Sequence, residues 1–86
     1  MIRQSIKIQL PSGLEARPVA VLVQVASQYE SAVYLEADGK RVNAKSIMGM
    51  MTMALKAGEK LIVEANGADE EAAIEGIEKY ISGQEA

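Results

Sequence analysis

The dipeptide Asp38-Gly39, which lies between two runs of strand-forming residues, constrains the fold of this chain more than any other feature. Both residues of a two-residue hairpin turn adopt positive φ, a conformation that aspartate and glycine tolerate. We therefore expect residues 32–36 and 40–43 to pair as antiparallel strands. A hairpin in a chain whose other strands alternate with helices predicts an antiparallel or mixed sheet with helices packed on one face.

Hydrophobic periodicity locates the other elements of the first half. Apolar and polar residues alternate over 2–10, apart from Gln4, as in a half-buried strand. Residues 16–27 are almost wholly apolar, and we predict a buried helix there. Four valines in this run also alternate as they would in a strand. The length of the run and Pro18 near its start favour the helix, because an amide proton is not needed in the first turn.

The second half contains two helices with recognisable first residues and a strand between them. Ser46 is the expected N-cap of a helix over 47–56, with Gly58 just past its end. Residues 60–65 form the last predicted strand. Asp69 is expected to cap a final helix, in whose first turn two glutamates suit the positive end of the helix dipole. The apolar positions of this helix follow a helical period and are Ala73, Ile74, Ile77, Tyr80 and Ile81.

The resulting order, β-α-β-β-α-β-α, predicts a single domain over residues 1–86, because the chain is too short for two. The pattern alone leaves a ferredoxin-like arrangement equally open. With no cysteine and no histidine, the chain has neither disulfides nor the usual ligands of a transition metal, and we expect no metal and no cofactor. A formal charge of −3 and only three aromatic residues argue against direct binding to nucleic acid.

The hydropathy of the chain gives no indication of a membrane protein. No apolar run approaches the roughly 20 residues that cross a bilayer. Arg3, Gln4 and Lys7 interrupt any apolar segment of the kind that a signal peptide has. We therefore expect a cytosolic protein that makes no membrane contact.

Two motifs resemble those of the HPr family, the phosphocarriers of the bacterial sugar phosphotransferase system. Residues 13–18 read Gly-Leu-Glu-Ala-Arg-Pro, where the active-site loop of the family reads Gly-Leu-His-Ala-Arg-Pro. Residues 34–49 resemble the second signature of the family, whose regulatory serine falls on Ser46. The resemblance extends over essentially the whole chain. It implies an α+β fold, the open-faced β-sandwich of HPr type, in which a four-stranded antiparallel sheet is covered on one face by three helices.

Glu15 occupies the position of the histidine that the family phosphorylates. Without an imidazole, the resemblance implies a regulatory protein that is neither a competent phosphohistidine carrier nor an enzyme. The replacement points to the catabolite-repression HPr-like branch (Crh), where glutamine is the usual residue, so glutamate is a further departure. Glu15 either stabilises the helix start, which we favour, or partly mimics the phosphorylated carrier and pairs with Arg17. An acyl phosphate on Glu15 is a third chemical possibility.

Ser46 also has two interpretations. Taken alone, a serine before an apolar helical run is an N-cap. The resemblance implies a second role, because HPr kinase/phosphorylase uses ATP to phosphorylate this serine in the family members of Gram-positive bacteria. A phosphate at a helix N-terminus faces unpaired amides, so we expect modification to leave the fold intact and to change the surface charge by nearly two units.

The helix after Ser46 has two apolar faces. The face expected in the core consists of Met50, Met53, Ala54 and Ala57. Ile47, Met48 and Met51 share another face, which a short helix on a one-sided sheet cannot also bury. Either a neighbouring loop covers this second face, or it stays exposed as an interaction surface, for which methionine is well suited.

The resemblance implies that this second face binds partners together with Arg17, Lys45 and phosphorylated Ser46. For Arg17 the alternative is a solvated surface arginine. Lys40, Arg41 and Lys45 are expected on the solvated face of the hairpin, with Lys45 the one that reaches a partner. The implied partners are HPr kinase/phosphorylase and a LacI-type catabolite control regulator, whose binding to operator DNA the phosphoprotein promotes.

A second functional hypothesis is a phosphorylation-independent module that regulates a metabolic enzyme or a phosphotransferase component. In that case Glu15 supplies a constant negative charge. The first strand is amphipathic and a breaker follows it, so exchange of this strand between copies is conceivable, and we expect a monomer or a weak homodimer.

Overall fold

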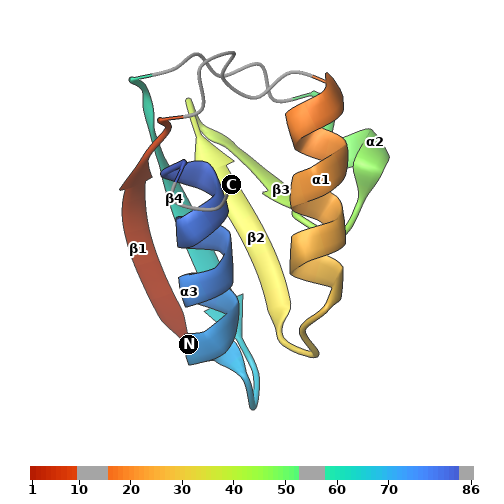
Figure 1. The fold of residues 1–86 in the computed structure, drawn as a ribbon, viewed down its shortest axis with the longest axis vertical. Helices are drawn as coiled ribbons and strands as arrows, with labels where there is room; N and C mark the ends of the chain where they lie inside the picture. The colour runs from red at the N-terminus through yellow and green to blue at the C-terminus, as the bar shows by residue number, and fades with distance from the viewer. Residues whose placement is uncertain (10–15, 53–57, 84–86) are drawn as a thin grey trace.

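The strands and helices follow one another in the predicted order in the computed structural model, which describes residues 1–9, 16–52 and 58–83 (Figure 1). The strands are β1 (Ile2–Lys7), β2 (Ala32–Ala37), β3 (Lys40–Asn43) and β4 (Lys60–Asn66). The helices are α1 (Ala16–Ser27), α2 (Ile47–Met50) and α3 (Glu70–Ile81). Of the helix predicted over 47–56, the structure describes α2 and the turn that follows it, and residues 53–57 lie outside the described residues.

The sheet is four-stranded and antiparallel, in the order β1-β4-β2-β3. The predicted hairpin joins β2 to β3, and its two turn residues, Asp38 and Gly39, have φ of 52° and 76°. Strands β1 and β3 are therefore the two edges. This is the α+β architecture that the sequence predicts.

All the helices lie on one side of this sheet. In Figure 1, α1 and α3 lie side by side in front of the strands, and α2 lies beside α1 near the β3 edge. No helix of the described residues covers the opposite face of the sheet, which we call the open face. No helix in the described part of the chain is long and apolar enough to cross a membrane.

The core lies between the helices and the sheet. Because side chains alternate along a strand, Ile6 and Ile8 point inward while Lys7 points to the open face. On α3 the predicted apolar face is buried, apart from Tyr80, which is half-buried. Burying each large aliphatic side chain of this kind contributes about 1.5–3 kcal/mol to stability. The largest buried apolar side chains are Ile8, Leu22, Leu35, Met50, Leu61, Ile77 and Ile81.

The prediction that the side chain of Asp69 caps the final helix, α3, is wrong. Asp69 stands at the N-cap position but makes no capping hydrogen bond. Its carboxylate turns instead to the α1–β2 connection, where it accepts hydrogen bonds from the backbone N–H groups of Glu30 (2.8 Å) and Ser31 (2.9 Å) and from the Ser31 hydroxyl. These amides belong to a connection outside the sheet ladder, and the carboxylate satisfies them.

Candidate functional site

Ser46 lies at the N-cap of α2 with an extended backbone, at φ −105° and ψ 113°. Its Oγ accepts a hydrogen bond from the backbone N–H of Gly49 at 3.2 Å, and its carbonyl oxygen accepts one from Met50 at 2.9 Å. The N-cap prediction is therefore confirmed. The residue is half-buried and lies between the end of the hairpin and the start of the helix.

The burial of one side chain fixes the orientation of α2. Met50 is fully buried and points into the core, and α2 packs against α1 and β3. The predicted second face, formed by Ile47, Met48 and Met51, consequently points outward. These three side chains, which we call the α2 patch, have exposed fractions of 50%, 83% and 56%.

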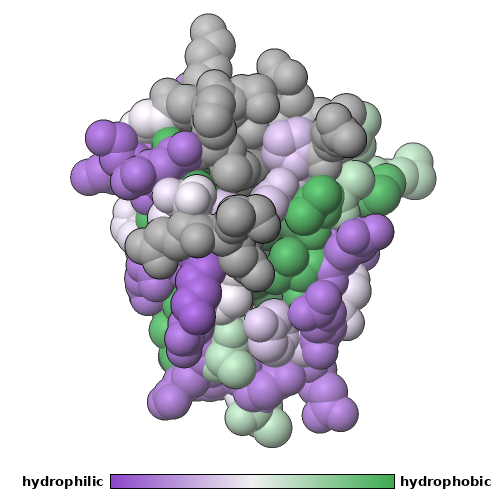
Figure 2. Space-filling model, in the orientation of Figure 1, coloured by the Kyte–Doolittle hydropathy of each residue, from purple (hydrophilic) through white to green (hydrophobic). Residues whose placement is uncertain are grey.

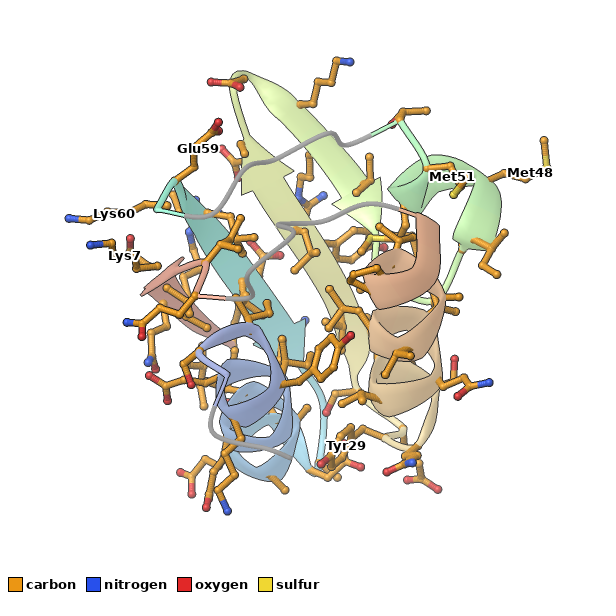
Figure 3. The ribbon with its side chains drawn as sticks, turned by 45° about the horizontal axis from the view of Figure 1, so that its top comes forward. Lys7, Tyr29, Met48, Met51, Glu59 and Lys60 are labelled. Atoms are coloured by element: carbon orange, nitrogen blue, oxygen red, sulfur yellow. The ribbon has the colours of Figure 1, made fainter. Side chains whose placement is uncertain are left out.

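The figures show the surroundings of the α2 patch. In Figure 3, Met48 projects from α2 away from the body of the molecule, and Met51 lies on the same helix. In Figure 2, hydrophobic surface gathers on the side of α1 and α2, whereas hydrophilic side chains surround α3. Exposed apolar side chains grouped in this way are typical of protein interaction sites.

Lys45 precedes Ser46 in the chain, but its ammonium is already bonded within the fold. Its Nζ donates a hydrogen bond to the backbone carbonyl of Tyr29 at 2.6 Å, and its backbone N–H donates to the side chain of Asn43 at 2.8 Å. The lysine therefore ties the α1–β2 connection to the start of α2. A partner can bind this ammonium only by sharing or displacing the Tyr29 carbonyl.

Of the two other predicted site residues, the structure describes only the backbone of Arg17. Arg17 is in the first turn of α1, but its side chain lies outside the described residues, as does Glu15. The adjacent backbone is held by α3, because the hydroxyl of Tyr80 donates a hydrogen bond to the carbonyl oxygen of Pro18 at 3.3 Å. Burial raises the pKa of Tyr80, which keeps this donor protonated. Helices α1 and α2 are in contact, and in Figure 1 α2 lies beside the N-terminal half of α1.

An ion network on the open face of the sheet was not predicted from the sequence. The carboxylate of Glu64, a residue only 6% exposed, accepts hydrogen bonds from Arg3 (2.8 Å) and Arg41 (2.5 Å). These hydrogen bonds, first of all that from Arg41, lower the pKa of Glu64. Arg3 also pairs with Glu36 at 3.2 Å, and Arg41 lies 4.0 Å above the ring of Tyr34. Arg41 is exposed on the hairpin, as predicted, but the sequence did not indicate its contacts with Glu64 and Tyr34.

Comparison with known proteins identifies the family. The family model described as "PTS HPr component phosphorylation site" matches residues 2–83. The chain belongs to the HPr family. Among curated relatives, the HPr-like protein Crh of Bacillus subtilis (strain 168) is 46% identical over 81 residues, which are 94% of this chain and 95% of that protein.

Solved structures of the HPr family agree with the fold. The phosphocarrier protein HPr of Bacillus anthracis superposes with a TM-score of 0.89 at 39% identity, over 93% of this chain and 95% of that one. Crh of Bacillus subtilis, in a crystal structure described as a dimer with a swapped domain, gives a TM-score of 0.77 at 44% identity, over 98% and 97% of the two chains. The relatives thus include phosphocarriers and HPr-like proteins.

Proposed function

We propose that this chain is a regulatory HPr-like protein that HPr kinase/phosphorylase phosphorylates on Ser46. The phosphorylated form binds a LacI-type catabolite control regulator and promotes its binding to operator DNA, and the protein acts by binding rather than by catalysis. The observation that supports this proposal most directly is the α2 patch, which is exposed and begins one residue after Ser46. An apolar contact surface thus adjoins the site where a charge can be added.

The interface of the proposed complex combines charge and apolar contact. The phosphate on Ser46 supplies nearly two negative charges and three acceptor oxygens, which an arginine or lysine of the regulator binds. Ile47, Met48 and Met51 supply the apolar contact, and the proposed interface also includes Arg17 and Lys45. The similarity to Crh supports the regulatory role over phosphate transport, because Glu15 replaces the phosphorylated histidine of the family.

The experiment that tests this proposal is phosphorylation in vitro. Purified protein is incubated with HPr kinase/phosphorylase, ATP and magnesium, and the intact mass is measured for the wild type and for Ser46→Ala. We expect one added phosphate on the wild type and none on the variant. An active kinase that modifies a phosphocarrier HPr but not this chain would contradict the proposal and favour the phosphorylation-independent module.

We also propose that the protein forms at most a weak homodimer, as the dimeric Crh structure suggests by similarity. Strand β1 is at the edge of the sheet and pairs only with β4 within the described residues, so its exchange between two copies would reproduce the same ladder. Sedimentation analysis at increasing concentration measures this association.

A further inference from the structure

Two lysines face each other directly on the open face of the sheet. Lys7 near the end of β1 and Lys60 at the start of β4 are paired residues of the antiparallel ladder, and both are exposed. In Figure 3 their side chains leave the sheet in the same direction. Paired residues of neighbouring strands have Cβ atoms about 5 Å apart, and like charges at such positions destabilise a sheet.

Nothing in the described part of the chain neutralises this pair. Neither lysine forms an ion pair with a described residue, and Glu59, the adjacent acid, points in another direction in Figure 3. The arginines of the same face, in contrast, are paired with carboxylates. We therefore expect the lysine pair to lower the stability of the fold.

The remaining residues of the open face favour a protein interface. Arg3 and Arg41 are held in place by the carboxylate of Glu64 and stay 46% and 49% exposed, so little side-chain freedom is lost when a partner binds them. Tyr34 and the half-buried Ile62 lie on the same face. Arginine and tyrosine are enriched where proteins bind one another.

The charge of the open face is opposite to that of the whole chain. Its strands present four cations, Arg3, Lys7, Arg41 and Lys60, against two carboxylates, Glu36 and Glu64, which leaves a net charge of +2. The chain as a whole carries −3, so all its other residues together carry −5. The positive charge is therefore concentrated on this face.

We propose that the open face around Lys7 and Lys60 is a second docking surface, whose partner is a protein that presents an acidic segment. No helix of the described residues covers this face, and a carboxylate placed between the two ammonium groups relieves their repulsion. The lysine pair lies on the β1 and β4 side of the sheet, whereas α2 contacts β3 at the opposite edge. Both surfaces can therefore be occupied at once.

Two other occupants fit the observations less well. Symmetric pairing with the open face of a second copy would bring two positively charged surfaces together. A nucleic acid requires more positive charge than a net +2 on a chain whose total is −3, because phosphates repel the acidic remainder. Both occupants are outcomes that the test distinguishes.

The test uses a photo-crosslinking residue, p-benzoylphenylalanine, in place of Ser5, an exposed residue paired with Ile62 on the open face. The full-length chain is crosslinked in cells that make the protein, and mass spectrometry identifies the crosslinked peptide. We expect a segment of another protein with a clear excess of aspartate and glutamate. Crosslinks to RNA, crosslinks mainly to a second copy, or no crosslink would each overturn the proposal.

Charge variants supply the matched controls. Lys7→Glu with Lys60→Glu keeps a like-charge pair and reverses its sign, so we expect the crosslink yield to fall about tenfold or more. Lys7→Glu alone creates an opposite-charge pair, which should raise the unfolding temperature while it still lowers the yield. Met48→Ser should leave the yield unchanged. Unchanged yield in both lysine variants, or equal loss in Met48→Ser, would overturn the assignment to this face.

Discussion

At the scale of single residues, the hydroxyl of Ser46 combines a structural and a proposed regulatory role. Its oxygen accepts the hydrogen bond of the Gly49 amide, which would otherwise be an unpaired donor at the helix start. A phosphate on this oxygen keeps acceptor oxygens beside the same amide and adds a favourable interaction with the helix dipole. Modification is therefore compatible with the fold described here.

Ser46→Ala should lower the free energy of unfolding. The variant leaves the Gly49 amide without its acceptor, and removal of a serine N-cap costs about 0.5–2 kcal/mol. Because α2 is short, we expect the lower half of this range. Urea unfolding measures the difference, with Ser5→Ala on an exposed strand position as the control. Equal stability of the two variants would show that the cap does not contribute.

Asp69→Asn should reduce the pH dependence of stability in acid. Hydrogen bonds from the Ser31 side chain and from the amides of Glu30 and Ser31 hold the pKa of Asp69 below its usual value. The stabilisation is complete above the unfolded-state pKa of about 4 and is lost as the pH falls toward the lower folded-state pKa. Asparagine does not titrate, so the variant should start less stable at neutral pH and lose less on acidification.

Thermal unfolding from pH 7 to pH 2 measures this effect. Ser31→Ala removes one of the three hydrogen bonds to Asp69 and is expected to give an intermediate pH dependence. If the unfolding temperatures of the wild type and of Asp69→Asn fall in parallel through this pH range, Asp69 does not contribute to the loss of stability in acid, and the prediction is contradicted.

At the scale of elements, periodicity and turn chemistry were sufficient to predict the order of the described strands and helices, because each has a local signal. Asp38-Gly39 specifies a hairpin, and Ser46 begins a helix. Contacts between distant residues were not predictable in this way. The carboxylate of Asp69 bonds residues 38 and 39 positions away, and Glu64 meets arginines from two other strands. These contacts depend on strand order and register, which local sequence patterns do not specify.

The predicted site shows the same division between local and distant signals. The exposure of Ile47, Met48 and Met51 follows from the helical period once Met50 is buried, so it could be predicted. The bond from Lys45 to the carbonyl of Tyr29 could not, because it joins the start of α2 to a connection 16 residues earlier. The position of Lys45 next to Ser46 in the sequence did not indicate which way the lysine side chain points.

Gly67→Ala should destabilise the connection between β4 and α3. A Cβ at this position would lie 2.7 Å from the backbone Cα of Ser31, which cannot move as a side chain can. We expect a loss of about 1–3 kcal/mol in the free energy of unfolding, as for other overpacked sites. Gly49→Ala is the matched control, because a Cβ there meets only ordinary contacts at 3.5 Å or more and favours the helix. Equal effects of the two substitutions would contradict this packing.

At the scale of the whole molecule, the fold separates two chemically different surfaces. The sheet order places β1 and β3 at opposite edges, with the lysine pair near one and α2 near the other (Figure 3). One surface is apolar and lies beside Ser46, the proposed phosphorylation site, and the other carries a net positive charge. If both proposals hold, the domain binds one partner in a phosphorylation-dependent way and another independently of phosphorylation.

The measurement that tests the proposed function most directly is the affinity for the LacI-type regulator, by titration calorimetry, of the wild type with and without phosphate on Ser46. We predict that phosphorylation tightens binding at least tenfold, because charge-assisted hydrogen bonds to phosphate form only then. We also predict that phosphorylated Met48→Ser loses most of this gain, while phosphorylated Ala32→Ser, changed on an exposed strand position, keeps it. Equal affinity of the two wild-type forms would contradict the account.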